Sequence, residues 1–425
     1  MIGIKLDKYK KMSITKEVLE MEAPKYLSIP LANGNDQNVT VLVKKDEYVC
    51  KGQIIGRTKG KFSVPLFSSV SGTVVDFVEK NATNGFPVKC VVIENDFKER
   101  EEEKEVINSD ITNFTKDEFI ERLHSCGIIG MGGSGFPTYV KYQTDGDIKT
   151  LIVNAVECEP YITADYMLLK TKVEEILECC DAIMEIFHME ECFIAFKVHN
   201  DELKEIIKSF IGTYPKIKMI EVPDVYPMGW EKSLVRYIKH VDYKVLPIEK
   251  GIVVNNVSTI YAIYEALKYN KPLIERIVTF SGCGSMKPQN IYVKVGTSAK
   301  EVIDTLVKTK AEEYSLVVGG PMMGNSPVGD DVIIASNTNC ILVLEKTNEQ
   351  ESIECLRCGK CVRACPVKIS PVIIKDYIDN DDRLKSLNVG KCIECGLCSY
   401  VCPSKIAVRE FVRKAKEKLR KEGGK

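Results

Sequence analysis

The sequence lacks an excess of charge of either sign, and it has few histidines. Its 425 residues carry 59 Lys and Arg against 60 Asp and Glu, so a nucleic-acid-binding protein, which needs a basic excess, is not expected. The 28 Gly and 17 Pro are scattered, which excludes collagen-like, mucin-like and disordered chains. Four histidines are too few for a His-rich zinc hydrolase. The composition predicts roughly two to four folded domains of about 150 residues each.

Long apolar runs are also lacking. The apolar runs, such as residues 332–335 and 340–344, fall far below the ~18 residues that a membrane-spanning helix needs. Residues 1–13 contain no apolar segment of the kind found in signal peptides. We therefore expect a cytoplasmic protein with no direct membrane span, which would lie at the inner membrane only through a partner.

Cysteine, in contrast, is abundant. The 17 cysteines are odd in number and follow no secretion signal, which favours metal ligation over a disulfide framework. Residues 355–366 read CLRCGKCVRACP and residues 392–403 read CIECGLCSYVCP. Each run has the C-x2-C-x2-C-x3-C-P spacing of bacterial ferredoxins, in which the fourth cysteine binds the other cluster. The spacing thus predicts two [4Fe-4S] clusters and a one-electron relay.

The same spacing assigns the ligands. One cluster takes Cys355, Cys358, Cys361 and Cys402, and the other takes Cys392, Cys395, Cys398 and Cys365. Gly359 and Gly396 would let the backbone approach the inorganic sulfide closely. A pair of zinc sites is the alternative, but zinc needs only four thiolates and has no use for the complete run written twice.

Most other cysteines are expected to be small buried hydrophobes. Cys283 differs, because it lies between two glycines in residues 281–285, SGCGS, where a thiol is sterically open. Redox or partner chemistry and an ordinary turn both fit this position.

Residues 127–137, GIIGMGGSGFP, form a glycine-rich loop. Gly130, Gly132 and Gly135 match G-x-G-x-x-G, but residues 115–125 before it predict a capped amphipathic helix, whereas a Rossmann fingerprint follows a strand. The loop could still bring backbone N–H groups to a phosphate, with Lys141 adding a charge. A mobile surface loop is the alternative.

Alternating strands and helices follow the loop. Strands are expected at 150–154, 192–198 and 217–222, with a helix capped by Thr163 that runs to residue 187 and another at 201–210, which indicates an α/β domain. Glu157 and Glu159 come just after the first of these strands, at the end where open α/β sheets bind ligands.

Four blocks now resemble a known family. They are GMGGSGFPTYVK (130–141), VNAVECEP (153–160), YPMGWEK (226–232) and NNVST (255–259), followed by the two cysteine runs. In this order they resemble RnfC, the NADH-facing subunit of the Rnf complex. The first, second and fourth blocks are also similar to the flavin-binding 51-kilodalton subunit of respiratory complex I.

The resemblance implies FMN and NADH as ligands in addition to the clusters. The residues that it implies for FMN are Gly130, Gly132, Gly133, Gly135, Lys141, Asn154, Glu157, Glu231, Asn255, Asn256 and Thr259. Phe136 and Glu159 would lie near the nicotinamide. Glu157, Glu159 and Cys283 are the expected catalytic residues.

The flanking regions complete the expected architecture. Short strands at 39–43, 53–57, 72–78 and 88–93 predict a β domain that resembles a lipoyl-type barrel-sandwich. It has Ser68, Ser69, Val70 and Ser71 in place of a lipoyl lysine, which suggests a docking module. Strands at 277–280, 291–295 and 316–318 and a helix at 299–307 resemble the β-grasp-like SLBB module. The tail after Val408 predicts a basic amphipathic helix that could dock an acidic partner.

The predicted fold class is multidomain α/β and α+β. The expected divisions are a barrel-sandwich-like domain at 1–95, an acidic linker at 96–112, an FMN/NADH domain at 113–270, an SLBB-like domain at 271–348 and a two-cluster ferredoxin-like domain at 349–425.

A mechanism follows from electron counting. NADH gives two electrons as hydride whereas a [4Fe-4S] cluster takes one, so FMN is expected between them. The acceptor could be the Rnf subunits or D-proline reductase. The chain lacks the Gly-Gly-x-His-Pro opening typical of RnfC, and with the 226–232 block and Cys283 it is most similar to RnfC-like proteins associated with D-proline reductase. A carrier with clusters but no flavin is the remaining alternative.

Overall fold

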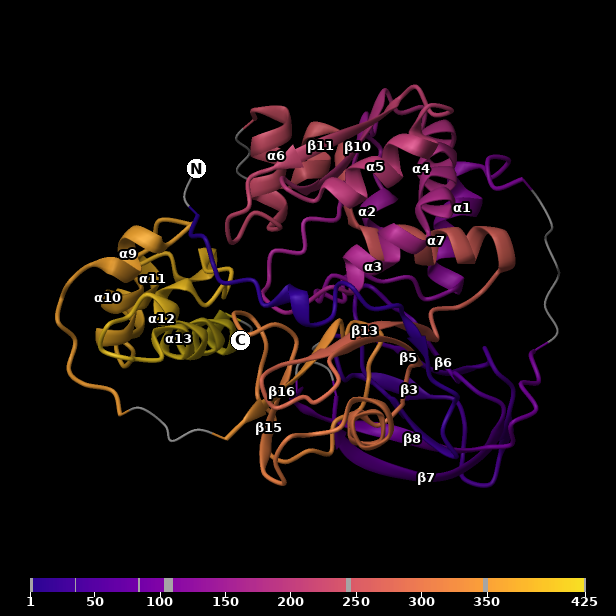
Figure 1. The fold of residues 1–425 in the computed structure, drawn as a ribbon, viewed down its shortest axis with the longest axis horizontal. Coiled ribbons are helices and arrows are strands. Elements are labelled where there is room, and N and C mark those ends of the chain that lie inside the picture. Colours follow the sequence, from indigo (N-terminus) through magenta and orange to yellow (C-terminus); the bar gives the residue numbers. More distant parts are fainter. Residues whose placement is uncertain are drawn as a thin grey trace.

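The computed structural model describes residues 3–34, 36–82, 85–102, 110–241, 246–346 and 351–423. Three β-containing regions pack together, and a smaller helical lobe lies to one side of them (Figure 1). Residues 103–109, within the expected acidic linker, and residues 347–350, which hold the expected boundary at 348/349, lie outside the described residues.

The N-terminal β region is a sandwich of two antiparallel sheets. Their strand orders are β2-β8-β7-β4 and β3-β5-β6. The strands are β2 (Tyr26–Pro30), β3 (Val39–Val41), β4 (Tyr48–Val49), β5 (Ile54–Thr58), β6 (Pro65–Phe67), β7 (Gly72–Asn81) and β8 (Pro87–Asn95). Apolar side chains from both sheets form one buried core, which includes Leu27, Ile55 and Val91.

The serine turn of this sandwich docks within the chain itself. Ser68, Ser69 and Ser71 are fully buried, and the Ser69 hydroxyl donates a hydrogen bond of 2.6 Å to the carbonyl of Val295. The turn therefore joins the sandwich to the third β region.

The second region is a parallel sheet of order β11-β10-β9-β12. Its strands are β9 (Thr150–Asn154), β10 (Glu191–Lys197), β11 (Ile217–Val222) and β12 (Ile252–Asn256). The helices are α1 (Lys116–Ser125), α2 (Thr138–Tyr142), α3 (Ala164–Thr171), α4 (Val173–Phe187), α5 (Asp201–Ile211), α6 (Glu231–Lys239) and α7 (Val257–Tyr269). One apolar core joins the sheet to α4, α5 and α7, and a second joins its other face to α6.

Two local predictions for this region can be compared with the structure. Helix α1 precedes the glycine loop and begins with a capping box between Thr115 and Glu118, as expected. The single helix expected from Thr163 to residue 187 is wrong, because Lys172 separates α3 from α4. Thr163 stands at the N-cap position of α3 as expected, but its side chain makes no capping hydrogen bond and its hydroxyl donates instead to the Asn290 side chain at 3.0 Å.

The third region is a mixed sheet of order β1-β14-β13-β16-β15. Its strands are β1 (Leu19–Glu20), β13 (Glu275–Ser281), β14 (Gln289–Lys294), β15 (Tyr314–Val318) and β16 (Cys340–Glu345). The expected helix at 299–307 is present, but it divides into α8 (Ala299–Val302) and a π-helical turn (Ile303–Val307). Because β1 pairs with β14, the chain visits this sheet before it enters the sandwich.

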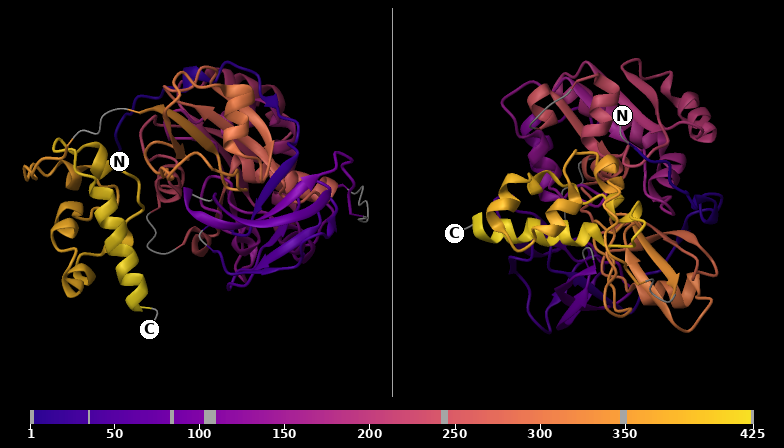
Figure 2. Two further views of the ribbon diagram at one scale, coloured as in Figure 1. Left: turned by 90° about the horizontal axis from the view of Figure 1, so that it is seen from below. Right: turned by 90° about the vertical axis from the view of Figure 1, so that its left-hand side faces the viewer.

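Residues 351–423, the cysteine-rich lobe, form a separate helical body (Figure 2). Its helices are α9 (Lys360–Ala364), α10 (Pro371–Asp376), α11 (Asp381–Ser386), α12 (Leu397–Tyr400) and α13 (Val408–Gly423). Gly396, with a φ of +76°, comes so close to the rest of the chain that an added Cβ would lie 2.3 Å from the Met322 carbonyl oxygen. Only glycine permits this contact between the lobe and the 319–324 turn.

Residues 3–13, the N-terminal strap, run between the lobe and the parallel sheet (Figure 1). Ile4 and Tyr226 exchange two backbone hydrogen bonds of 3.0 and 2.8 Å. Ile4 and Leu6 pack on a core that contains Tyr226, Cys395 and Leu397. The strap thus contacts both bodies at once.

No helix in the described ranges is long and apolar enough to cross a membrane.

Candidate functional site

A cavity of about 610 Å³ lies where the parallel sheet meets the glycine loop, the 319–325 turn and the cysteine-rich lobe. It brings together eleven of the residues predicted from the sequence. They are Gly130, Gly132, Gly133, Lys141, Asn154, Glu157, Glu159, Glu231, Asn255, Asn256 and Thr259.

The sheet explains why distant blocks meet. β9 and β12 are neighbouring parallel strands, and Asn154 and Asn256 are register partners at their carboxyl ends. Asn154 donates to the Gly229 carbonyl at 2.9 Å, and Asn255 donates to the Tyr142 hydroxyl at 2.6 Å. The amide side chains that line the cavity are therefore held in fixed orientations.

Hydrogen bonds hold the glycine loop, residues 127–137, in place, and we call the part of it that lines the cavity the glycine cradle. The Met131 N–H donates to the Thr259 hydroxyl at 2.9 Å, while Arg276 donates to the Met131 carbonyl at 3.1 Å. A Cβ on Gly132 would lie 3.3 Å from Asn256, and Gly133, at a φ of +105°, has no neighbour within 4 Å of such an atom. The backbone can thus approach a ligand closely, and side chains would fill that space.

Two of the residues predicted for FMN or the nicotinamide, Gly135 and Phe136, are not among those that line the cavity. An added Cβ on Gly135 would meet Asn33 and Gly34 of the sandwich at 3.3 Å, so this glycine allows the sandwich to pack on the loop. Phe136 is 38% exposed and packs edge-on against Phe62. The structure therefore does not support the prediction of Phe136 as a ligand-contacting residue, because the loop turns its ring away to the sandwich side.

Lys141 and Glu231 bring opposite charges to the cavity. Lys141 lies in α2 and Glu231 begins α6, and their charged atoms Nζ and Oε2 are 3.8 Å apart. The Lys141 ammonium also donates to the Val254 carbonyl at 2.6 Å. Burial lowers the pKa of Lys141 and raises the pKa of Glu231.

Glu157 pairs with a residue of the N-terminal strap. Lys10 Nζ donates to the Glu157 carboxylate at 3.0 Å and to the carbonyls of Glu157 and Ile162 at 2.8 and 2.5 Å. The Asp165 N–H donates to the other carboxylate oxygen at 2.9 Å. Burial is the largest cause that raises the pKa of Glu157 to about 7, and Lys10 opposes it.

Glu159 clamps the 319–324 turn. Its carboxylate accepts hydrogen bonds from the Met322 and Met323 N–H groups at 3.0 and 2.9 Å. A Cβ on Gly320 would lie 2.3 Å from its Oε2 atom. Burial raises the pKa of Glu159 to about 7. The structure thus gives this carboxylate two backbone partners next to the cavity.

Sequence reasoning missed a buried network behind the cavity. Asp165 accepts hydrogen bonds of 2.6 Å from both Asn256 and Ser258, and it faces the charge of Arg276, which is only 2% exposed. The acidic residue in the first turn after the 153–160 block is a signal that could have indicated Asp165. Nothing in the sequence indicates Lys10, which lies 147 residues from its partner.

The same cavity reaches the cysteine-rich lobe. Ile393, Glu394 and Cys395 contribute to its lining, and the Tyr226 hydroxyl donates to the Cys395 carbonyl at 2.8 Å. Cys158 also lines the cavity, and burial raises the pKa of its thiol to about 11. One cavity therefore connects the glycine cradle with the second cysteine run.

The cysteines of the lobe occur in two different settings. Cys365, Cys392, Cys395 and Cys398 line one small cavity, and we call them the inner set. Cys355, Cys358, Cys361 and Cys402 form the outer set; Cys358 is exposed and the others are half-buried. The inner set contains the four cysteines that the spacing assigns to one cluster, and the assignment of the outer set to the other cluster stays a prediction.

Each run also offers backbone donors to sulfur. The Arg357 N–H lies 3.4 Å from Cys355 Sγ and the Glu394 N–H lies 3.3 Å from Cys392 Sγ, with both residues at positive φ. Among the described residues, no group of three or more His, Cys, Asp or Glu side chains closes around a single metal ion. The donor chemistry fits sulfur-rich clusters, which are stabilised by N–H donors to sulfur.

Cys283 lies away from the cavity. It is exposed in the turn after β13, where an added Cβ on Gly282 would lie 2.2 Å from the Val343 carbonyl oxygen. It is not among the residues that line the 610 Å³ cavity. The structure does not bring Cys283 together with Glu157 and Glu159.

The basic helix at the end of the chain is partly used within the molecule. Arg409 of α13 donates to the carbonyls of Met322, Met323 and Gly324, and Arg413 donates to the Asn325 side chain at 2.7 Å. Those arginines attach the lobe to the cavity rim, so they are not available for docking a partner.

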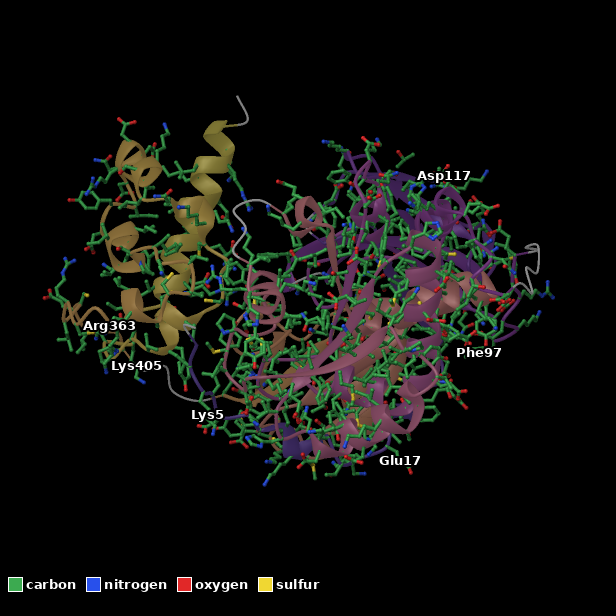
Figure 3. All side chains as sticks on the ribbon, turned by 90° about the horizontal axis from the view of Figure 1, so that it is seen from above. Lys5, Glu17, Phe97, Asp117, Arg363 and Lys405 are labelled. Atoms are coloured by element: carbon green, nitrogen blue, oxygen red, sulfur yellow. The ribbon has the colours of Figure 1, made fainter. Side chains whose placement is uncertain are left out.

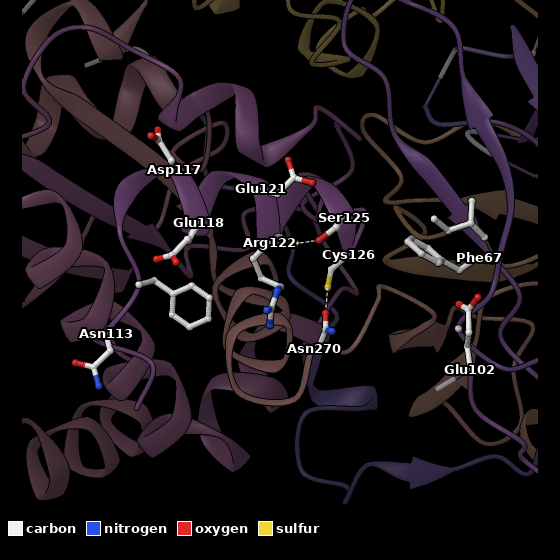
Figure 4. Close-up of a pocket in the computed structure, with 13 residues that line it drawn as sticks. Phe67, Glu102, Asn113, Asp117, Glu118, Glu121, Arg122, Ser125, Cys126 and Asn270 are labelled. Atoms are coloured by element: carbon white, nitrogen blue, oxygen red, sulfur yellow. Dashed lines mark hydrogen bonds between the residues drawn. The ribbon is translucent and has the colours of Figure 1, made fainter. Parts of the chain in front are cut away.

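A second cavity, of about 900 Å³, lies between the sandwich and α1 (Figure 4). Glu102, Asp117, Glu121, Arg122 and Cys126 are among its lining residues. None of the predicted site residues lines it.

Comparison with known proteins identifies the class. Three family models match: the RnfC barrel sandwich hybrid domain at residues 1–98, the Nuo51 FMN-binding domain at 123–265 and the 4Fe-4S dicluster domain at 347–403. The chain is thus an oxidoreductase subunit whose cofactors are FMN and two [4Fe-4S] clusters, and the cradle and the thiols fit these groups.

Relatives identify the family. The chain is 33% identical over 400 residues to the C subunit of the ion-translocating oxidoreductase complex of Rhodobacter capsulatus, covering 91% of this chain and 76% of the relative. It is 32% identical over 379 residues to the C subunit of the proton-translocating ferredoxin:NAD(+) oxidoreductase complex of Clostridium ljungdahlii, covering 88% and 82%. The chain belongs to the RnfC family.

Solved structures support the fold alone. An NAD+-reducing [NiFe]-hydrogenase in the air-oxidised state aligns with a TM-score of 0.54 and 14% identity, covering 74% of this chain and 67% of that chain. The H2-reduced state aligns with a TM-score of 0.52 and 16% identity, covering 74% and 62%.

Proposed function

We propose that this chain oxidises NADH at the glycine loop. The electrons then pass one at a time through the [4Fe-4S] clusters bound by the inner and outer cysteine sets to other subunits of an Rnf-type ferredoxin:NAD oxidoreductase. The observation that carries the proposal is the single cavity that connects the cradle, the asparagine-bearing strand ends and Cys395. The similarity to members of ion- and proton-translocating oxidoreductase complexes supports this choice of partner.

We assign the cradle roles by position. The N–H groups of the glycine loop and the Lys141 ammonium would bind the FMN phosphate, because both line the cavity and carry positive charge. Asn154, Asn255, Asn256 and Thr259 would orient the rest of the cofactor through the strand ends. When bound, FMN accepts two electrons together and releases them one at a time.

Glu157 is the proposed polar contact for the nicotinamide side of the site. With Lys10 against its carboxylate and its pKa raised to about 7, it can hold or release a proton at neutral pH. Glu159 is the proposed second acid there, and its two backbone partners also keep the turn in place.

The difference in exposure between the two cysteine sets suggests the order in which electrons pass through the clusters. The inner set shares Cys395 with the cavity, whereas the outer set contains the exposed Cys358. We propose that electrons reach the inner cluster first and leave the chain from the outer cluster.

The domain divisions and the location are part of the same proposal. We propose the five domain divisions 1–95, 96–112, 113–270, 271–348 and 349–425. Within the first of them, the N-terminal strap would contribute to the cavity through Lys10, which pairs with Glu157. The chain would lie on the cytoplasmic face of the inner membrane through its partner proteins.

An anaerobic titration of the FMN- and iron-reconstituted chain with NADH tests the function. We expect the flavin absorbance and the cluster absorbance to bleach together. If dithionite reduces the clusters but NADH reduces neither group, the chain is an iron–sulfur carrier or scaffold and the NADH-oxidising proposal is wrong.

A second partner, D-proline reductase, is favoured by one observation. Cys283 is an exposed thiol on a glycine turn, away from the cavity and open to another protein. In this version the Cys283 thiolate attacks a disulfide of the reductase, forms a mixed disulfide and releases one thiolate of the reductase. Two electrons supplied one at a time by the clusters, with a proton, then reduce the mixed disulfide and regenerate the Cys283 thiol. The Cys283→Ser variant should then slow reduction of proline reductase while leaving NADH-dependent flavin reduction intact; an unchanged rate would remove the relay.

A further inference from the structure

Arg409 of the cysteine-rich lobe binds the 319–325 turn of the third β region. Its Nη1 atom donates to the carbonyls of Met322 and Gly324 at 3.2 and 3.1 Å, and its Nη2 atom donates to the carbonyl of Met323 at 3.0 Å. Three carbonyls on one planar guanidinium fix its orientation, whereas a lysine ammonium on a flexible stem has no such fork. One side chain therefore holds the lobe against the turn.

The other polar groups of the same turn bind the parallel-sheet region. The Glu159 carboxylate accepts hydrogen bonds from two N–H groups of the turn at 3.0 and 2.9 Å. Close by, the Tyr226 hydroxyl donates to the Cys395 carbonyl at 2.8 Å, and Gly396 lies against the Met322 carbonyl. The turn is thus held between a carboxylate of the parallel-sheet region and a guanidinium of the lobe.

The wall between the flavin cavity and the inner set contains a cation. The 610 Å³ cavity and the small cavity of the inner set have four lining residues in common, which are Ile393, Glu394, Cys395 and Arg409. The Arg409 side chain is 12% exposed. Arg409 therefore contacts both redox sites as well as the turn.

Helix α13 connects Arg409 with the inner set. Val412, three residues further along α13, belongs to a core that includes Cys365 and against which Cys392 and Cys398 pack. The Arg409 N–H also donates to the Ser399 hydroxyl at 2.9 Å. A displacement of Arg409 from the turn would therefore move the inner set with it.

Few other contacts of this kind are needed to hold the lobe, because it stands beside the β-containing regions as a separate body. Figure 3 shows the lobe with Arg363 and Lys405 labelled, and Lys5 of the strap at the boundary. The position of the lobe thus depends on the strap and on the contacts at the cavity wall.

We propose that Arg409 is a positioning residue that sets the distance between the flavin site and the inner cluster. The inference rests on the proposed function, because the electrons must cross this wall. Each transfer takes one electron from reduced FMN and adds it to the inner cluster, so FMN is oxidised by one electron and the cluster is reduced by one. Because such a transfer depends steeply on distance, a loosened lobe would receive electrons slowly.

Anaerobic stopped-flow reduction of the FMN- and iron-reconstituted full chain by NADH gives the first test. Arg409→Gln removes the fork and the charge, and Arg409→Lys removes only the fork. We expect both variants to lower the rate of cluster reduction about ten-fold or more, while NADH still reduces their flavin. The matched control Lys414→Gln removes an exposed cation from the same helix, and we expect the wild-type rate.

Two further measurements do not depend on turnover. Hydrogen–deuterium exchange of the peptide that covers residues 319–325 should become about ten-fold faster in both Arg409 variants and stay unchanged in Lys414→Gln, because the turn loses its carbonyl partner. A redox titration followed by electron paramagnetic resonance gives the midpoint potential of the inner cluster. Arg409→Lys should leave this potential unchanged because it keeps the charge, whereas Arg409→Gln should lower it.

The variants separate positioning from charge. If Arg409→Lys passes electrons at the wild-type rate while Arg409→Gln is slow and has a lower potential, Arg409 acts through its charge alone and the positioning proposal is wrong. Unchanged exchange of residues 319–325 in both variants would also overturn it. If NADH does not reduce the flavin of the wild-type chain, the proposed function is wrong, and the exchange comparison still decides whether Arg409 holds the lobe.

Discussion

The cysteine runs and the flavin cavity are built in opposite ways. Each run takes its three closely spaced ligands from seven consecutive positions, and only one ligand comes from the other run. The cavity instead takes its walls from the glycine loop, the ends of β9 and β12, the 319–325 turn and α13. The spacing of residues in the sequence predicts a local site such as a cysteine run, whereas a composite site such as the cavity depends on how separate elements pack.

The difference predicts which substitutions act at a distance. Changes in the runs should remove a cluster and leave the remaining fold nearly intact. Substitutions around the cavity should also affect the contacts between the parallel-sheet region, the third β region and the cysteine-rich lobe, because hydrogen bonds at the cavity wall connect these regions.

The largest effect is expected from Asp165→Asn. It removes the buried negative charge that faces Arg276, and an uncompensated buried charge costs about 3 kcal/mol of folding free energy. Denaturant unfolding followed by circular dichroism measures the loss. A loss below about 0.5 kcal/mol would show that Arg276 does not depend on Asp165.

The next effect is expected from Gly133→Val. The new side chain would enter the open cradle at a backbone conformation that disfavours it, so FMN affinity should fall about 100-fold, or roughly 3 kcal/mol. Flavin fluorescence titration gives the Kd. The control Gly212→Val lies at an ordinary φ of −61° with no neighbour within 4 Å, and it should bind FMN like the wild type.

A smaller effect is expected from Lys10→Met, which leaves the Glu157 carboxylate without its cation. Stability should fall by about 2 kcal/mol at pH 8, and less at pH 6, where Glu157 can take up a proton. The double variant Lys10→Met/Glu157→Gln should recover part of the loss. Equal losses for the single and double variants would contradict the pairing.

The smallest effect concerns pH. Because burial raises the pKa of Glu159 from 4.5 to about 7, the folded state holds this proton longer than the unfolded state. Stability therefore falls as pH rises from about 4.5 to 7, and the contribution between pH 6 and 8 is about 1 kcal/mol. Unfolding of Glu159→Gln should show a weaker pH slope than the wild type; an unchanged slope would show that Glu159 is ionised throughout.

Local features were predictable from the sequence. The capping box at Thr115 and strand 150–154 depend on neighbours a few residues away. The same holds for the inner cysteine set, whose four members line one small cavity as the spacing predicts.

Features set by long-range packing were not predictable. The break at Lys172 lets α3 contact β13 while α4 packs along β10. The 3.6-residue apolar period continues through both helices, so it could not predict this break. The Phe136 ring packs against Phe62 of the sandwich, and Lys10 binds Glu157 although the two residues are far apart in the sequence. Neither contact can be predicted from neighbouring residues. Arg409 lies in the helix that was predicted to dock an acidic partner, but it donates to the Met322 carbonyl of this chain.

The central claim is that the inner set lies between the flavin cavity and the outer set. The direct test is anaerobic stopped-flow reduction by NADH of Cys395→Ser and of Cys358→Ser, with each cluster followed by absorbance and electron paramagnetic resonance. We predict that Cys395→Ser stops NADH from reducing the outer cluster while dithionite still reduces it, and that Cys358→Ser leaves reduction of the inner cluster unchanged. Reduction of the outer cluster at the wild-type rate in Cys395→Ser would contradict the proposed route.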